Sequence, residues 1–320
     1  MTTRDEHPGF GKAPLVVDVL PLEQATSLLI ERSGRTDEEH ECRALAKALG
    51  RLPLALEQAG AYLEQHGVEV ASYLEGFPRR KVRFLKARKF DGKLQGDYEA
   101  TVANTWKISF DQLKDENPAA AAVLYSLAFL APEEIPLKFF THWPTELEAV
   151  EDESLEDRES TAREQLIRPL TRYSFVQERK RHTFSIHRLV QEVIRYELAG
   201  QDFLSETFEA AHRALDACFP EAPESPGSWE EGLLWMPHIL QGLDAWRALE
   251  LPPAWDPTRL WARAGFNAWA AGRASRAREL DTEVVDVRRR VLGEEHPSTL
   301  ISICNLLHMI SPGSGGREEC

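Results

Sequence analysis

The sequence predicts a mainly α-helical protein with one small β-hairpin and a C-terminal helical repeat. Apolar residues recur at helical spacing through most of the 320 residues. Two short runs, 174–176 and 183–186, alternate polar and apolar side chains, which is typical of paired strands. A helical pattern that begins at Trp261 returns at Ile303, which indicates a repeated helical unit.

Composition excludes several classes of function. The chain carries 52 acidic and 38 basic residues, for a net charge of −14, whereas nucleic-acid surfaces need clustered positive charge. Its 4 cysteines are far apart, so we expect reduced thiols, no zinc site and no bound metal. No run approaches the ~18 apolar residues of a membrane span. Residues 1–11 lack a signal-peptide pattern, so we expect a cytoplasmic protein without a membrane partner.

The N-terminal third predicts helices joined by a sharp corner. Residues 15–20 look like a short strand, and Pro21 opens the first helix. A second helix over 37–49 stops at Gly50, because glycine tolerates the left-handed cap conformation. Pro53 then suits the first turn of a new helix, where a missing N–H costs nothing. That helix places on one face Leu56, Ala59, Tyr62 and Leu63.

The middle of the chain predicts three helices and a hairpin, the combination of a winged helix. The helices cover 101–110, 119–129 and 163–173, and the second is apolar almost all round, so it should be buried. The acidic segment 146–159 reads as an exposed loop. Residues 178–181 join the two alternating runs as a charged hairpin tip.

His187 stands where the second run ends and a helix over 188–198 begins. The N-terminus of that helix offers N–H groups to an anion. Two readings stay open: a structural histidine, or a histidine that contacts a phosphate. The basic segment 79–89 has the same ambiguity, between a phosphate-binding strip and a solvated linker or helix, and the acidity of the whole chain favours the second.

Further helices follow at 204–218 and 229–249, and Asp256 should cap the next one, with Pro257 at its first position. The small residues after Trp261 let two helices approach closely, and a second unit begins at Ile303. We expect the helix after Pro297 to expose four apolar side chains, and therefore self-association through 297–310 or docking onto another repeat protein. Those side chains are Ile301, Leu306, Leu307 and Ile310.

Two motifs resemble NB-ARC domains, the nucleotide switches of STAND-class signalling proteins. Leu52-Pro53-Leu54-Ala55 resembles the Gly-Leu-Pro-Leu-Ala motif, and the resemblance implies that Pro53 packs against the adenine of ADP. Ile186-His187-Arg188 stands in place of the Met-His-Asp motif, which implies that His187 contacts the β-phosphate. Arg51 in place of glycine, and Arg188 in place of aspartate, depart from the family pattern.

The C-terminal repeat resembles a tetratricopeptide repeat, and residues 291–300 are similar to the link between repeats of kinesin light chains. This resemblance implies protein partners that bind the repeat helices. Together the patterns predict the following segments: a remnant of the nucleotide-binding sheet (1–20), a helical ARC subdomain (21–78), a basic linker (79–97), a winged-helix subdomain (98–200), connecting helices (201–256), one full and one partial tetratricopeptide-like repeat (257–310), and a flexible tail (311–320).

A phosphate-binding P-loop is absent from the sequence. Gly9-Phe10-Gly11-Lys12 lacks the spacing, and Ala13 lacks the hydroxyl that would bind Mg²⁺. The chain therefore resembles the C-terminal half of an NB-ARC switch with the opening of its repeat array. We expect a signalling or scaffold module that is not an enzyme, has no catalytic residues, and binds ADP or ATP weakly. The alternatives are a helical-repeat scaffold without nucleotide binding and, less favoured, a winged-helix transcription regulator.

Overall fold

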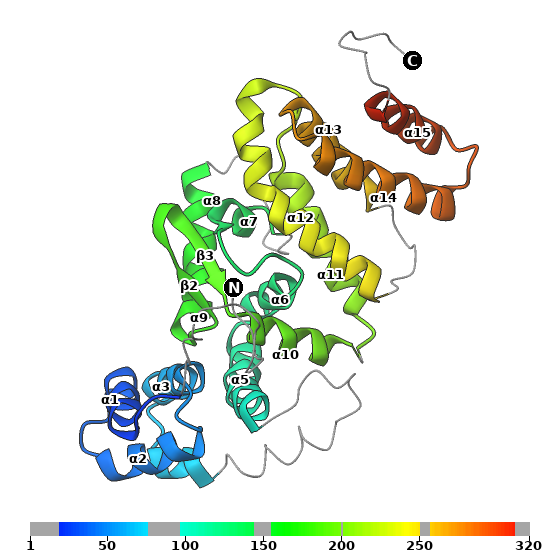
Figure 1. The fold of residues 1–320 in the computed structure, drawn as a ribbon. Helices are drawn as coiled ribbons and strands as arrows, with labels where there is room; N and C mark the ends of the chain where they lie inside the picture. The colour runs from blue at the N-terminus through cyan, green and yellow to red at the C-terminus, as the bar shows by residue number, and fades with distance from the viewer. Residues whose placement is uncertain (1–18, 76–96, 144–154, 200, 250–256, 311–320) are drawn as a thin grey trace, which may run out of the picture. The chain divides into compact units, whose positions relative to one another are not determined.

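The computed structural model describes five stretches of the chain: 19–75, 97–143, 155–199, 201–249 and 257–310 (Figure 1). These stretches are mainly helical and include one three-stranded sheet, in agreement with the predicted mainly α fold. The chain divides into two compact units, residues 1–109 and 110–320, and each is described by itself. None of the described helices has the length and hydropathy required to cross a bilayer.

In the described part of the first unit, three helices follow the predicted order: α1 (Leu22–Ser33), α2 (Glu39–Ala48) and α3 (Pro53–His66). Residues 70–75 are also helical. Helix α1 packs against both of the others, and Leu29, Leu45 and Leu56 are completely buried in this unit. Residues 19 and 20 are not in a strand, and the rest of the predicted strand lies outside the described residues. The basic segment 79–89 also lies outside them.

A glycine allows α1 and α3 to approach closely. A Cβ atom at Gly60 would lie 2.7 Å from Cγ and 2.8 Å from Cβ of Arg32, so only a residue without a side chain fits there. The same Arg32 forms ion pairs with Glu57, at 3.5 Å, and with Glu64, both on α3. The contact therefore combines close backbone packing with charge pairing along α3.

Helix α6 (Pro118–Leu127) lies in the middle of the second unit. Four segments pack around it: η1 (Arg163–Ile167), α9 (Arg168–Arg172), α10 (Arg188–Leu198) and α11 (Leu204–Cys218). This arrangement explains why α6 is apolar almost all round, as the sequence predicted. Helix α5 (Asp97–Glu116) precedes it, and the side chain of Asn117 caps α6 by accepting the N–H of Ala120 at 2.9 Å.

The predicted hairpin is present, as β2 (Val176–Glu178) and β3 (Thr183–Ile186), with η2 (Lys180–His182) between them. A third strand was not predicted: β1 (Ile135–Pro136) pairs with the other side of β3, so the antiparallel order is β1-β3-β2. Helix α7 (Leu137–Thr141) follows β1 directly. Pro136 therefore lies in an edge strand. There a proline is tolerated, because the sheet does not need a hydrogen bond from its missing N–H.

The prediction of an exposed loop over 146–159 is wrong for its C-terminal part. Helix α8 (Leu155–Ala162) covers those residues and continues directly into η1. Glu156 and Asp157 lie in its first turn, where carboxylates interact favourably with the helix dipole, so the same acidic residues that suggested a loop stabilise a helix start. Residues 144–154 lie outside the described residues.

The C-terminal helices pack in series from α11 onward. They are α12 (Trp229–Leu249), preceded by the short η3 (Pro226–Ser228), then α13 (Thr258–Ala270), α14 (Ala274–Leu292) and α15 (Pro297–Ile310). Pro257 was predicted as the first helical residue, but it occupies the position before the helix, and α13 begins at Thr258. Asp256, the predicted cap, lies outside the described residues.

The predicted exposure of α15 is confirmed for two of its four residues. Ile301 is 59% exposed and Leu307 is 58% exposed. Leu306 is instead half-buried, because it lies on the same stripe of the helix as the buried Thr299 and Ser302. The side chain of Ile310 lies outside the described residues.

Candidate functional site

Pro53 opens α3 at the end of a tight corner, as predicted. Gly50 and Arg51 both adopt left-handed backbone conformations, with φ of 66° and 58°, and Leu52 returns to an extended conformation before the helix. The N–H of Leu20 donates to the carbonyl oxygen of Arg51 at 3.2 Å, which ties the incoming chain to the corner. The Pro53 ring is exposed, and so it is accessible to a ligand from solvent.

The backbone at Arg51 has a conformation that favours glycine, with φ of 58°. A left-handed conformation costs a residue with a Cβ atom roughly 1–2 kcal/mol. Arg51 therefore holds the same corner at some cost in free energy, with its side chain exposed to solvent.

His187 forms the N-cap of α10 directly after β3. Its Nδ1 accepts the backbone N–H of Leu189 at 3.1 Å, and its carbonyl oxygen accepts the N–H of Gln191 at 3.2 Å. Because Nδ1 accepts a hydrogen bond, the ring carries its proton on Nε2, which becomes a donor. Burial around the ring holds the pKa of His187 below its ordinary value, although the residue as a whole is exposed. The site thus presents a neutral imidazole at a helix N-terminus.

Polar side chains on α10 anchor this histidine to the centre of the unit. The amide nitrogen of Gln191 donates to the carbonyl oxygens of Leu127, at 2.7 Å, and Leu130, at 2.9 Å. Arg195 donates to the carbonyl oxygen of Ala128 at 2.6 Å. These bonds reach carbonyl groups of the last residue of α6 and of the turn that follows it, where the regular bonds of the helix end. No local pattern in the sequence indicates this contact, because its donors and acceptors are more than 60 residues apart.

The two predicted site residues belong to different units. Pro53 lies in residues 1–109 and His187 lies in residues 110–320. Each residue occupies the local setting that the sequence predicted, a helix start after a corner and a strand-to-helix junction. A joint ligand site remains a prediction.

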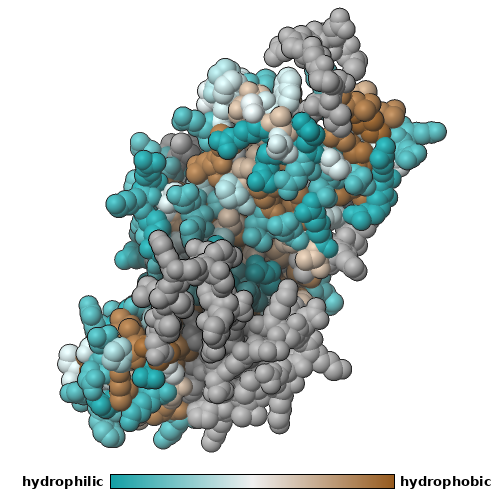
Figure 2. Space-filling view, viewed as in Figure 1, coloured by the Kyte–Doolittle hydropathy of each residue, from teal (hydrophilic) through white to brown (hydrophobic). Residues whose placement is uncertain are grey.

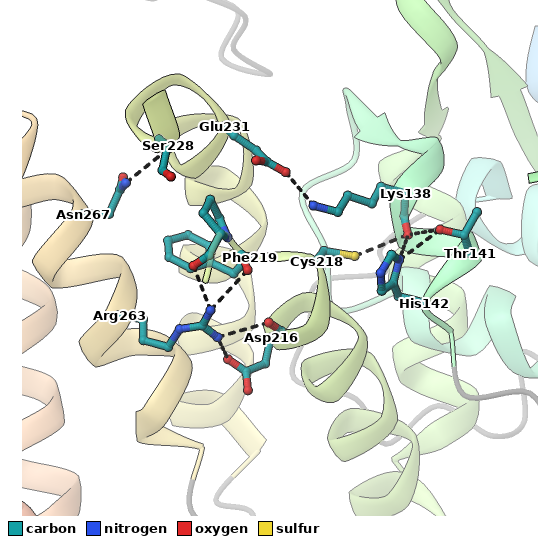
Figure 3. Close-up of polar contacts among 11 residues, drawn as sticks. Lys138, Thr141, His142, Asp216, Cys218, Phe219, Ser228, Glu231, Arg263 and Asn267 are labelled. Atoms are coloured by element: carbon teal, nitrogen blue, oxygen red, sulfur yellow. Dashed lines mark hydrogen bonds and ion pairs between the residues drawn. The ribbon is translucent and has the colours of Figure 1, made fainter. Parts of the chain in front are cut away.

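Arg263 connects α13 to the C-terminal end of α11 through several polar contacts (Figure 3). The guanidinium forms an ion pair with the Asp216 carboxylate and donates to the carbonyl oxygens of Phe219, at 3.2 Å, and Pro220, at 2.8 Å. It also lies 5.4 Å from the centroid of the Phe219 ring. One cation therefore satisfies several acceptors where α11 ends.

Asn267, one turn further along α13, holds the next part of the same connection. Its amide nitrogen donates to the carbonyl oxygens of Pro223, at 2.9 Å, and Ser228, at 3.3 Å. Gly232 on α12 leaves room for this side chain, because a Cβ atom there would lie 2.3 Å from Asn267 Oδ1. Arg263 and Asn267 thus fix the segment between α11 and α12 onto α13.

Lys138 on α7 contacts the other side of the same helices. Its ammonium forms an ion pair with Glu231 on α12 at 2.6 Å, and its carbonyl oxygen accepts a bond from the Cys218 thiol on α11 at 3.3 Å (Figure 3). Continuous polar contacts therefore run from α7 next to the sheet, through α11 and α12, to α13. We call the contacts of Lys138, Asp216, Glu231, Arg263 and Asn267 the polar junction.

Arg288 joins the last three helices. From α14 it donates to the Thr258 hydroxyl on α13, at 2.7 Å, and to the Ser302 hydroxyl on α15, at 2.6 Å. Nearby, Asp281 on α14 faces Gly265 on α13, where a Cβ atom would lie 3.0 Å from Oδ1. Burial raises the pKa of Asp281 to about 6, and the charge of Arg288 partly opposes this rise.

The described residues offer no cluster of three side chains suited to a metal ion. Burial raises the pKa of Cys42 to about 11 and that of Cys218 to about 12, so neither thiol forms a reactive thiolate near neutral pH. Cys304 is exposed on α15.

Comparison with known proteins yields two matches. Residues 109–203 match a family described as a domain of unknown function, DUF7779. The chain is also 26% identical over 286 residues to a nucleotide-binding leucine-rich repeat (NLR)-like protein of Hyaloscypha variabilis. That alignment covers 86% of this chain but 27% of the relative's length. The likeness supports a relation to the NLR and NB-ARC families and nothing finer.

Proposed function

We propose that the chain is a regulatory or scaffold segment of a STAND-type signalling protein. In this role it contributes part of an ADP-binding switch and couples that part to protein-binding, tetratricopeptide-like helices. The observation that carries the proposal is the setting of His187, which presents a neutral Nε2–H donor at a helix N-terminus. Both features suit a phosphate oxygen, since the helix dipole and the N–H donor favour negative charge. The NLR-like relative supports the same reading.

The arrangement of the second unit supports a winged-helix reading of residues 98–200. Three helical segments surround a small antiparallel sheet whose β2–β3 hairpin has a basic tip, and α10 then leads away from the sheet. The polar junction supports coupling of this part to the later helices, because it connects α7 to α13 through charged groups and backbone carbonyls.

The same proposal predicts weak nucleotide binding and no hydrolysis by residues 1–320. Pro53 and His187 supply one apolar surface and one donor, whereas tight phosphate binding needs the many N–H groups of a P-loop. We therefore expect ADP to bind with a Kd weaker than ~1 mM, equivalent to about 4 kcal/mol.

Titration of the chain with ADP, followed by NMR or calorimetry, tests this proposal. His187→Ala should remove the weak binding, and His182→Ala, which changes an exposed histidine of the hairpin tip, should leave it unchanged. Micromolar ADP binding, or ATP turnover that disappears with His187→Ala, would contradict the account. No binding even at the highest ADP concentration would favour the alternative, a helical-repeat scaffold without nucleotide.

A further inference from the structure

The last described helix carries an apolar face with a symmetric pattern. Five exposed residues of α15 lie within one turn on either side of Cys304: Leu300, Ile301, Cys304, Leu307 and His308. Leu300 and Ile301 precede Cys304 by four and three residues, and Leu307 and His308 follow it by three and four. At 3.6 residues per turn these positions share one face of the helix, with Cys304 at its centre.

The opposite face of α15 packs on α14. Thr299 and Ser302 are buried there, and Ser302 accepts a bond from Arg288. At the edge of the exposed face the His308 ring lies 6.2 Å from the Trp269 ring on α13. The exposed face is apolar by comparison: Leu300 is 50% exposed, Ile301 59% and Leu307 58%. Figure 2 shows hydrophobic surface gathered over this helix. We call the five exposed residues the α15 face.

The helix also carries no charged side chain. Residues 297–310 contain no aspartate, glutamate, lysine or arginine, whereas the whole chain has a net charge of −14. Two copies of so acidic a chain repel each other at most surfaces. They can approach through a neutral helix at a smaller electrostatic cost, and a face that is symmetric about its centre is self-complementary under a two-fold axis.

We propose that α15 is a self-association surface, in which two copies of the chain pack their α15 helices antiparallel with Cys304 next to the two-fold axis. In this arrangement Leu300 and Ile301 of one copy meet Leu307 and His308 of the other. The contact buries apolar side chains and brings no like charges together. The inference does not depend on nucleotide binding.

The size of the surface predicts a weak, concentration-dependent dimer. A single pair of helices buries less than the ~1,600 Å² of a typical stable interface, so we expect a Kd between about 10 µM and about 1 mM. Because the contact is apolar and the chains repel each other, association should persist or strengthen as salt rises from about 50 mM to about 500 mM.

Crosslinking through Cys304 tests the geometry directly. Every protein in this experiment carries Cys320→Ser. Because Cys42 and Cys218 are buried and react slowly, a short bismaleimide crosslinks mainly through the exposed Cys304. We expect dimers to be trapped faster than in the matched control Cys304→Ser/Ser275→Cys, whose thiol is exposed on α14. Equal crosslinking rates in the two proteins would overturn the proposal.

Sedimentation of surface variants tests the contact independently of the thiol. Leu307→Glu and Ile301→Glu should each weaken association by about tenfold or more, because each places a charge in an apolar contact. Leu234→Glu changes a leucine on α12 that is 40% exposed and should have no such effect. Circular dichroism checks that each variant folds. The proposal is wrong if the chain stays monomeric at protein concentrations up to about 1 mM. It is also wrong if association weakens as the salt concentration rises.

Discussion

Replacing Arg263 with alanine tests whether the polar junction determines the stability of the second unit. The Arg263 side chain is 20% exposed and pairs with Asp216, whose side chain is 23% exposed. The variant would remove an ion pair and several bonds to backbone carbonyls. It would leave the carbonyl oxygens of Phe219 and Pro220 without this donor, and Asp216 with the exposed Arg259 as its remaining ion-pair partner. Each of these effects lowers the free energy of unfolding.

The magnitude follows from the partial burial of these groups. Breaking a fully buried ion pair costs about 3–5 kcal/mol, and an exposed pair is worth about 0–1 kcal/mol. A hydrogen bond to a charged group adds about 1.5–3 kcal/mol. For a pair that retains some contact with water we expect a loss of about 3 kcal/mol in the free energy of unfolding. Arg263→Lys should lose less, because the ammonium keeps the charge but cannot form the forked contacts.

Urea denaturation, followed by the tryptophan fluorescence of the second unit, measures this loss. Arg259→Ala is the matched control: its Nε lies 3.7 Å from the same Asp216 carboxylate, but its side chain is 75% exposed. The control should change stability by less than about 0.5 kcal/mol. If both variants are equally stable, the reasoning about Arg263 is wrong and apolar packing alone joins α11 to α13.

Three further predictions concern single residues. Gly60→Ala should lower stability by about 1–3 kcal/mol, because its Cβ atom would overlap Arg32, and denaturation measures the loss. Arg51→Gly should raise stability by about 0.5–1 kcal/mol in the same assay, because glycine adopts the left-handed corner without strain. Since the pKa of Asp281 is raised to about 6, stability should fall as pH rises from about 4 to about 6, and Asp281→Asn should remove this dependence and stabilise the chain by about 1–3 kcal/mol at pH 7.5.

Two of these changes have a control in the same chain. Gly227→Ala places a Cβ atom in open space and should be nearly neutral. Asp286→Asn alters an exposed carboxylate on the same helix as Asp281 and should leave the pH dependence intact. A stable Gly60→Ala protein, a destabilised Arg51→Gly protein, or an unchanged pH profile in Asp281→Asn would each contradict the corresponding argument.

Local signals predicted the helices well. The bounds of α10, α11 and α12 agree with the expected ranges 188–198, 204–218 and 229–249. Each has a clear apolar stripe, and breaking residues follow α11. The Gly50–Pro53 corner was equally predictable, because glycine and proline restrict the backbone in known ways.

Contacts between distant residues were not predictable in this way. Strand β1 has two residues and exists because β3 pairs with it. Ile135 pairs with Phe184, 49 residues later along the chain, and Pro136 pairs with Thr183, 47 residues later. The polar junction was missed for the same reason, since Arg263 and Lys138 find their partners about 40 to 90 residues away. Periodicity reports which face of a helix is buried, but it does not report which carbonyl group an arginine on that face will bind.

The polar junction and the setting of His187 are linked by helices that pack against one another. Gln191 and Arg195 hold α10 to the end of α6, and α6 packs against α11, which ends at Asp216 and Cys218 near Arg263 and Lys138. A change at His187 that moves α10 therefore changes the support of α6, and through it the position of α11. Because these contacts are charged or involve buried carbonyl groups, a shift that breaks them costs several kcal/mol, about as much as a typical allosteric coupling energy. If the proposed ligand binds at His187, these contacts offer a route by which it would be coupled to helices α11–α13 within the second unit.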